Sequence, residues 1–378
     1  MKIKAKPEDF FVKEIKALSI KDKGDYAYFL LTKRGENTID VLRKISRTFR
    51  IPLKNIGFAG LKDKEAITKQ YISIKDIDKT ALEKLRNYKD ENFSVEFLGF
   101  GEEGIELGDF EGNYFEIVIR DITPKKIEKI EEKIPFIQKY GFENYFGEQR
   151  FGSVINAQEF VVKHLLKNDY EEAMKEYLLS IRDKRRKKLM RKSWGKWNEF
   201  LKHIPPMSKA EIDMIKALKR GLSFKKAFMV LPKNIRLMFA FAYQSYLWNM
   251  YLYTFVIRYF RYCRTPFLKW ELAFIKHIDD YIFNQIRNLK IPALGTEYPP
   301  KDSKIKMIIK EVLESEGITQ EILKAERIGI KLFTDFERPA FSFPEELKIL
   351  QKEENAIKLS FILSPGSYAT VLLKKLMC

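Results

Sequence analysis

The sequence is poor in the residues that metal and disulfide chemistry require. Its 378 residues include two cysteines, Cys263 and Cys378, and three histidines, His164, His203 and His277. Two cysteines in dissimilar contexts make no disulfide framework and are typical of a reducing cytoplasm. The histidines are scattered, with neither ligand spacing nor a partnered cysteine. The sequence therefore predicts no metal site.

Two further motifs are missing. No glycine-rich phosphate loop follows a predicted strand, so nucleotide-dependent chemistry has no motif here and no cofactor is expected. The first ten residues, MKIKAKPEDF, lack the apolar core of a secretory signal. Both absences favour a cytoplasmic protein that works without a bound nucleotide.

Only one stretch is long and uncharged enough to suggest a membrane span, residues 237–257. It contains Gln244, Ser245 and Asn249. We find no second stretch like it, and we interpret it as a buried helix of a soluble domain rather than a membrane segment.

What the sequence has in abundance is positive charge. Lys and Arg number 70 against 52 acidic residues, giving a net charge of +18. This excess favours a polyanionic partner, with nucleic acid ahead of a membrane, although a general lysine-rich bias explains it too. With 45% hydrophobic residues, a chain of this length can bury two cores.

The pattern along the chain predicts an α+β fold with an insertion. Strand-like and helix-like segments alternate irregularly over about the first 150 residues, and longer helical patterns fill residues 157–330. The last 40 or so residues revert to a predicted strand, turn and strand. Strand-rich ends around a helical middle indicate a second domain inserted into the first.

Three stretches carry candidate chemistry. Asp63 lies between Lys62 and Lys64, which would keep its carboxylate ionised near an anionic ligand, although a surface turn has the same charge pattern. NYFGEQRFG, at residues 144–152, combines aromatic rings and Arg150 with glycines that permit close approach, although such a segment also suits a packed turn. Residues 182–197 interleave nine Lys and Arg with two Trp, as in a phosphate-binding surface or a solvated helix face.

Several motifs together resemble one family, the TruD family of tRNA pseudouridine synthases. They occur in the family's order and span nearly the whole chain: KAKPEDFFVKE, GFAGLKDKEAITKQY, GNYFEIVIRD, NYFGEQRFG, AYQSYLWN and SPGSYATVLLKK. The second and fourth motifs are highly specific in combination. The resemblance favours a catalytic role for Asp63 over a surface turn.

The resemblance also implies a fold and a reaction. It implies a pseudouridine synthase catalytic domain with a mixed, largely antiparallel β-sheet, carrying an inserted helix-rich TRUD domain. The expected bounds are residues 1–153 and 336–378 for the catalytic domain and 154–335 for the insertion. The implied activity is the isomerisation of uridine to pseudouridine in tRNA, without cofactor or metal, at uridine 13 in the family's best-known target.

Carried over by position, the family's catalytic aspartate is Asp63 and its active-site phenylalanine is Phe146. Lys4, before the PEDF string, and Asn249 also match family positions, the latter without a known role. The expected substrate-binding residues are Lys4, Phe146, Lys62, Arg150 and Asn249, with Asp63 as the catalytic residue. The expected partner is structured tRNA in a basic cleft, with no membrane or obligate protein partner. The motifs leave open whether Asp63 acts as a nucleophile or as a base.

Two other functions remain possible from the sequence. A non-catalytic tRNA-binding chaperone could share the fold, but binding alone gains nothing from a carboxylate that faces RNA. A magnesium-dependent nuclease would need clustered acidic residues, which this region lacks. Of the three functions, the isomerase is the one that accounts for Asp63.

Overall fold

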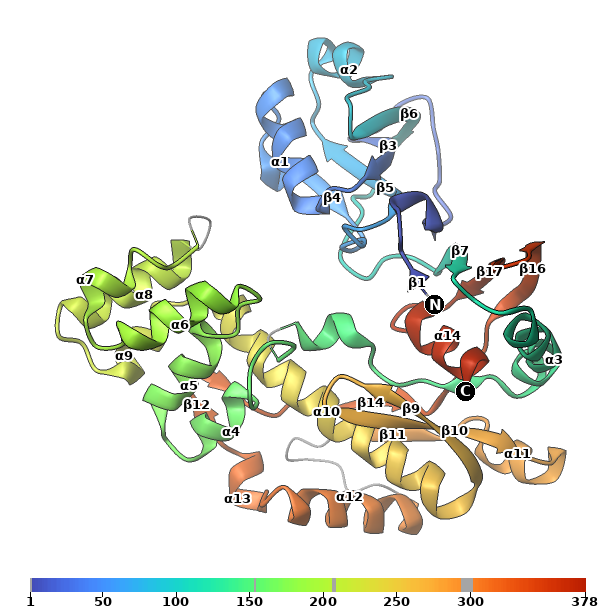
Figure 1. Ribbon diagram of the computed structural model, residues 1–378. Coiled ribbons are helices and arrows are strands. Elements are labelled where there is room, and N and C mark those ends of the chain that lie inside the picture. The colour runs from blue at the N-terminus through green and yellow to red at the C-terminus, as the bar shows by residue number, and fades with distance from the viewer. Residues whose placement is uncertain (1, 153, 206–208, 294–301) are drawn as a thin grey trace. The chain divides into compact units, whose positions relative to one another are not determined.

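A computed structural model describes residues 2–152, 154–205, 209–293 and 302–378. The chain divides into two compact units, drawn in Figure 1. Unit 1 comprises Met1–Phe142 and Ser342–Met377, and unit 2 comprises Glu143–Phe341 with Cys378. Unit 1 is thus assembled from both ends of the chain, and each unit is described by itself.

Unit 1 is built on a nine-stranded sheet whose order is β16-β17-β7-β2-β5-β3-β6, with β1 beside β7 and β4 beside β5. Only the β2–β5 pair is parallel; the other pairs are antiparallel. This confirms the predicted mixed, largely antiparallel sheet and the α+β class. The strands are β1 (Lys2–Ile3), β2 (Phe10–Ile15), β3 (Tyr26–Arg34), β4 (Ile56–Phe58), β5 (Ile67–Lys75), β6 (Phe93–Gly101), β7 (Gly112–Arg120), β16 (Glu345–Glu353) and β17 (Ala356–Leu363).

The centre of the sheet joins the two ends of the chain. Strand β17 pairs with β7 from Ala356 opposite Arg120 to Leu363 opposite Asn113. In Figure 1 the red C-terminal strand therefore lies beside the teal β7. The segment between them leaves this sheet, forms most of unit 2 and returns to the sheet as β16.

The core of unit 1 lies between the sheet and two helices, α1 (Thr38–Phe49) and α2 (Lys79–Leu85). Strand β3 contributes Ala27, Phe29 and Leu31, which alternate along the strand and so face the same side. Helix α1 buries residues at helical spacing, including Leu42 and Ile45. The next residue on that face of β3 is Lys33, which is fully buried.

Two more helices complete unit 1, α3 (Pro124–Tyr140) and α14 (Ala369–Met377). The predicted strand at the C-terminal end is wrong, because α14 follows β17 after a short turn. Its buried Ala369, Leu372, Leu373 and Leu376 are spaced i, i+3, i+4 and i+7, which is the spacing of one helix face. A short apolar run allowed both interpretations.

Unit 2 is rich in helices, of which α10 (Lys233–Tyr259) is the longest. Within the described ranges, no helix combines the length and apolar character that a membrane span requires. The other helices are α4 (Val161–Leu166), α5 (Tyr170–Leu178), α6 (Lys184–Lys192), α7 (Trp197–Phe200), α8 (Lys209–Lys219), α9 (Phe224–Phe228), α11 (Asp280–Ile286), α12 (Ser303–Ser315) and α13 (Gln320–Leu323).

Unit 2 also contains strands that the helical pattern did not predict. Helix α10 packs against the antiparallel hairpin β9–β10 and against β11, which pairs with β14. Trp248 on α10 donates a hydrogen bond to the carbonyl oxygen of Ile291 at 2.9 Å. The strands are β9 (Arg261–Phe267), β10 (Trp270–His277), β11 (Lys290–Ala293), β12 (Glu326–Arg327), β13 (Ile330–Lys331) and β14 (Phe336–Pro339), while β8 (Phe142–Glu143) and β15 (Phe341–Ser342) span the unit boundaries.

The interpretation that the cysteines form no disulfide is wrong. Cys263 on β9 is bonded to Cys378, with the two Cα atoms 5.9 Å apart and a separation of 115 positions in the sequence. Two cysteines so far apart in the chain give no sign in the sequence that they meet. Disulfides do occur inside cells in hyperthermophiles, so the bond by itself does not identify a compartment.

Candidate active site

One face of the unit 1 sheet changes from apolar to polar at the end of three strands. The parallel register of β2 and β5 and the antiparallel register of β3 and β5 place Glu14, Lys33, Thr68 and Gln70 on the same face as the core. All four are fully buried. Buried polar groups need partners, and Glu14, Lys33 and Gln70 find them in the loop of residues 59–66. The Thr68 hydroxyl has no hydrogen-bond partner among the described residues.

A hydrogen-bonded chain fixes that loop. Gln70 donates from Nε2 to the carbonyl oxygen of Gly60 at 3.1 Å and accepts at Oε1 from the hydroxyl of Thr38 at 3.1 Å. The same Thr38 oxygen accepts from the backbone N–H of Lys62 at 3.1 Å. The first half of the loop is therefore hydrogen-bonded to Gln70 of the sheet through Gly60 and to Thr38 of α1 through Lys62. Asp63 follows directly after these fixed residues.

Asp63 is held at both carboxylate oxygens. Lys4 pairs with Oδ2, and the backbone N–H of Glu65 donates to Oδ1 at 3.0 Å. The side chains of Lys4 and Asp63 are only 15% and 14% exposed, so the ion pair is shielded from water. A carboxylate with a cation on one oxygen and an N–H donor on the other has a fixed orientation.

Lys4 reaches Asp63 from a strained backbone position. Its φ of 60° lies in the left-handed region, a conformation that costs an ordinary residue about 1–3 kcal/mol and that clusters at functional sites. The following segment is anchored by Asp9, whose buried carboxylate accepts from Arg120 at 2.8 to 3.0 Å. The PEDF string is thus a structural anchor that presents Lys4.

Lys62 is committed to a second carboxylate. Its Nζ lies 2.6 Å from Oε2 of Glu14 and donates to Oδ1 of Asn113 at 2.9 Å. It also lies 4.5 Å from the ring centroid of Phe110. The side chain of Lys62 is only 6% exposed, so the ion pair that neutralises Glu14 is shielded from water.

Lys33 is hydrogen-bonded to the main chain of Asp63. Its Nζ donates to the carbonyl oxygen of Asp63 at 2.7 Å and to that of Glu36 at 2.8 Å. Burial lowers the pKa of Lys33 to about 8, an effect that Asp63 and Glu36 oppose and that Lys62 reinforces. The ammonium group thus fixes the backbone of the candidate catalytic residue.

The other predicted residues lie in unit 2, around Phe146. Asn249 on α10 accepts from the backbone N–H of Phe146 at 2.8 Å and donates to its carbonyl oxygen at 3.0 Å. Both side chains are buried. Asn249 therefore satisfies both main-chain groups of Phe146 and sets its position, a role that the motif alone did not reveal.

The Phe146 ring is packed by arginines and aromatic rings. The guanidinium of Arg338 lies 4.2 Å from its centroid, that of Arg150 lies 5.6 Å away, and the Trp248 ring meets it edge-on at 5.5 Å. Arg150 also donates from Nε to the hydroxyl of Ser245 at 3.0 Å. Arg338 donates to Asn144 at its backbone carbonyl, 2.8 Å away, and at its side-chain oxygen, 2.7 Å away.

Comparison with known proteins decides the family. The model of the family described as tRNA pseudouridine synthase D (TruD) matches residues 1–266 and 267–376. The chain belongs to the TruD family of tRNA pseudouridine synthases, which are isomerases. The family predicted from the sequence motifs is therefore confirmed.

Individual relatives agree. The chain is 58% identical over 378 residues to the tRNA pseudouridine synthase D of Aquifex aeolicus, covering all of this chain and 98% of the relative. It is 37% identical over 400 residues to a protein of Methanocaldococcus jannaschii named a probable tRNA pseudouridine synthase D 2, covering 99% and 91%. The crystal structure of a TruD protein from Methanosarcina mazei matches 99% of this chain and 93% of that chain, with a TM-score of 0.70 and 26% identity.

For this TruD chain, the structure brings three of the predicted residues together in unit 1, namely Lys4, Lys62 and Asp63. The other three, Phe146, Arg150 and Asn249, are grouped in unit 2. Among the described residues, no group of three or more His, Cys, Asp and Glu is arranged to hold a metal ion.

Sequence reasoning missed Glu14, Lys33 and Arg338. The first two had a readable signal, because each continues the buried alternation of its strand, where a charged residue is out of place. Arg338 had none, since its partners are nearly 200 residues away in the sequence.

Proposed function

We propose that this protein isomerises uridine to pseudouridine in tRNA, with Asp63 as the catalytic carboxylate. The observation that carries the proposal is the shielded Lys4–Asp63 pair, in which both carboxylate oxygens are oriented by donors. Catalysis by a carboxylate, as nucleophile or as base, requires an ionised and fixed group in a site with little water.

The reaction suits a site of this composition. The C1′–N1 bond of the uridine breaks, the uracil turns, and a C1′–C5 bond forms, while C5 loses a proton and N1 gains one. Product and substrate have the same atoms and electrons, so the reaction needs neither an oxidant nor a reductant. Asp63 would attack the sugar or the base, or remove a proton from the ribose.

The target base must leave the RNA stack before it can react, which costs a few kcal/mol. We propose that Phe146 is the aromatic residue that receives the base, since stacking of this kind contributes about 1–3 kcal/mol. Phosphate contacts from Lys and Arg would supply the remaining affinity, in keeping with the net charge of +18. Unit 1 would be the catalytic domain and unit 2 the TRUD insertion.

Release of tritium from tRNA labelled at C5 of uridine tests the activity. The full-length protein should release one tritium for each pseudouridine formed, and mapping of the product should place it at uridine 13. A transcript with cytidine at position 13 is the matched control and should release none. A protein that binds and refolds tRNA without releasing tritium would be the chaperone instead.

A further inference from the structure

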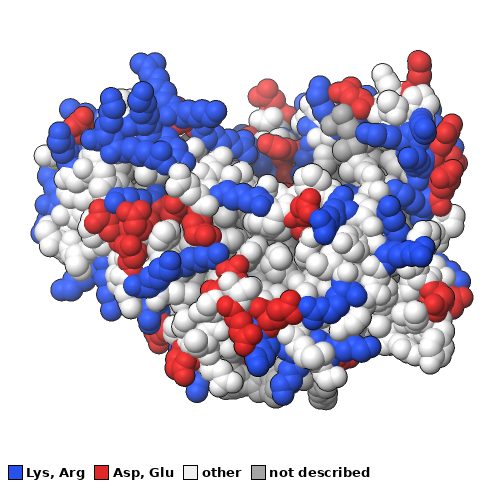
Figure 2. Space-filling view, turned by 60° about the horizontal axis from the view of Figure 1, so that its bottom comes forward, with Lys and Arg blue, Asp and Glu red and all other residues white. Residues whose placement is uncertain are grey.

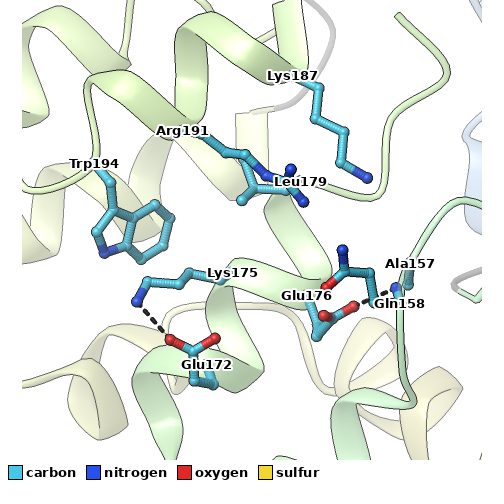
Figure 3. A pocket seen from close by; sticks show the side chains of 9 residues that line it. All are labelled: Ala157, Gln158, Glu172, Lys175, Glu176, Leu179, Lys187, Arg191 and Trp194. Atoms are coloured by element: carbon cyan, nitrogen blue, oxygen red, sulfur yellow. Dashed lines mark hydrogen bonds and ion pairs between the residues drawn. The ribbon is translucent and has the colours of Figure 1, made fainter. Parts of the chain in front are cut away.

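Unit 2 contains a pocket of about 290 Å³ between helices α5 and α6, shown in Figure 3. It is far in sequence from the Asp63 loop, and no residue of the candidate active site lines it. Helix α5 supplies one wall and helix α6 the other, with a short turn closing the side. The lining residues are Ala157, Gln158, Glu172, Lys175, Glu176, Leu179, Lys187, Arg191 and Trp194.

The α6 wall carries uncompensated positive charge. Seven of the nine residues in KRRKKLMRK are Lys or Arg, so cations recur at i and i+4 along the helix, an arrangement that destabilises it. Figure 3 shows that Lys187 and Arg191, one such pair, point from α6 toward the pocket. Figure 2 shows Lys and Arg side chains gathered at the upper left, on the side where Figure 1 draws α6–α9.

These cations have few anionic partners. Lys187 donates to the backbone carbonyl of Asn156 at 3.0 Å, and Lys269 donates to that of Gln158 at 2.7 Å. Within the described part of the chain, the Arg191 guanidinium makes neither a hydrogen bond nor an ion pair. Burial lowers the pKa of Lys187, and the charges of Arg191 and Lys269 lower it further against the opposing effect of Glu176.

The carboxylates of the pocket are already engaged. Glu176 accepts from the backbone N–H of Gln158 at 2.7 Å and from that of Glu159 at 3.2 Å. Glu172, also on α5, accepts from Lys175 at 2.5 Å. The positive wall is therefore left for a ligand from outside the chain.

The tryptophans of this region do not offer a stacking surface. Trp194 lies parallel to Phe224 with centroids 6.4 Å apart, and the Lys175 ammonium lies 5.5 Å from its ring. Trp197 meets Trp194 edge-on at 5.3 Å and Phe200 at 5.9 Å. Both rings belong to an aromatic cluster, so charge and not base stacking would recognise the ligand.

We propose that Lys187 and Arg191 bind a backbone phosphate of the RNA substrate in this pocket, away from the residues that perform the reaction. The proposal rests on the proposed function, which makes tRNA the substrate. RNA fits better than a free anion, because exposed cations continue along α6 beyond the pocket and would meet neighbouring phosphates of one strand.

The test compares two double variants of the full-length protein. K187Q/R191Q removes the pocket pair. K184Q/K188Q is the matched control, because it has the same helix, spacing and charge loss but its residues do not line the pocket. Affinity for tRNA is measured over a series of salt concentrations, and helicity and melting temperature are checked for both variants.

We expect K187Q/R191Q to weaken tRNA binding at least about tenfold at 100 mM salt, and to flatten the log–log salt dependence by about 0.7–0.9 per lost contact. The control should lose less than half as much. Equal losses in both variants would mean that α6 contributes only diffuse positive charge, and that result would overturn the proposed phosphate site. No loss in either variant would overturn it as well.

A second arm separates the possible sources of phosphate. The wild-type melting temperature is measured in inorganic phosphate and in chloride at equal ionic strength. If phosphate stabilises the wild type but not K187Q/R191Q, while tRNA affinity is the same for both, the pocket serves a free anion and the RNA proposal is wrong. Tritium release by the wild type tests the proposed function separately, so a failure of one proposal is distinguishable from a failure of the other.

Discussion

The cations of unit 1 around Asp63 and the cations of α6 in unit 2 differ in one decisive respect. In unit 1, Lys4 and Lys62 are each paired with a carboxylate and are at most 15% exposed. On α6, Lys187 donates only to a backbone carbonyl, and Arg191 has no partner among the described residues. The cations of unit 1 have carboxylate partners within the protein, whereas neither Lys187 nor Arg191 forms an ion pair among the described residues.

This difference assigns them different work. A buried and fully paired charge has one geometry, which is what orienting a reactive group requires, and it has little attraction left for a distant anion. An exposed cation without a partner can neutralise a phosphate and release counterions. Changes near Asp63 should therefore act on turnover, whereas changes on α6 should act on affinity.

The largest expected effect is that of Asp63→Asn. The amide keeps the size of the side chain but removes its charge and basicity, so we expect turnover in the tritium assay to fall below about 1% of wild type. Affinity for tRNA should stay within a few-fold. Asp121→Asn, at an exposed pair with Lys2, is the control and should retain full turnover. An Asp63→Asn protein that turns over above that level would exclude Asp63 from catalysis.

Phe146→Ala should have the next largest effect. If the ring receives the flipped base, its loss removes roughly 1–3 kcal/mol of transition-state stabilisation, which is about ten- to a hundredfold in single-turnover rate. Phe146→Tyr should retain much of that rate, because the stacking face remains. The alternative is that the ring only packs against its neighbours. An Ala variant with a lowered melting temperature but a normal rate per folded molecule would show that Phe146 is purely structural.

Asn249→Leu should act mainly on stability. It removes the two hydrogen bonds that the Asn249 side chain makes with buried main-chain groups of Phe146, at a cost of about 1–3 kcal/mol for each. Urea unfolding measures this loss. Ser245→Ala, one turn earlier on α10, removes only a hydroxyl that accepts from Arg150 and should cost less. Equal losses in the two variants would argue against a special role for the Asn249 clamp.

The smallest expected effect is a pH dependence caused by Lys33. Its pKa is about 8 in the folded protein against an ordinary value of 10.5, so between these values the unfolded chain binds more protons than the folded chain. Stability should therefore rise with pH across that window. Urea unfolding at pH 7.5, 8.5 and 9.5 measures the slope, and Lys33→Met, which has no charge to titrate, should have a smaller slope. Identical slopes would show that Lys33 is not the group that titrates there.

Local pattern predicted most of unit 1. The strands at residues 26–34, 67–75 and 93–101 are each a β-rich run between turns, so their positions can be read from the local sequence. The helix at Pro124–Tyr140 begins at its proline, a residue that is favoured in the first turn of a helix. The long helical pattern that begins at residue 157 is instead divided into α4 and α5, since Asn168 adopts a φ of 58° and Asp169 caps the second helix.

What the sequence could not supply was contact between distant residues. Asp63 stood out by its motif, but its attachment to Lys33 depends on the register of β3 against β5. Likewise the clamp between Asn249 and Phe146 joins residues 103 positions apart, and the bond between Cys263 and Cys378 joins residues 115 apart. Such pairings follow from the assembled fold and leave no local trace in the sequence.

The pairing of β17 with β7 has a consequence for the newly made chain. During synthesis, β7 is complete by residue 120, but its partner is not finished until Leu363 has been added. Until then, the backbone groups on one edge of β7 are unpaired and can pair with a strand of another chain, which is a recognised route to aggregation. Truncated chains that end before residue 356 should therefore be insoluble, even though they contain every residue of the Asp63 cluster.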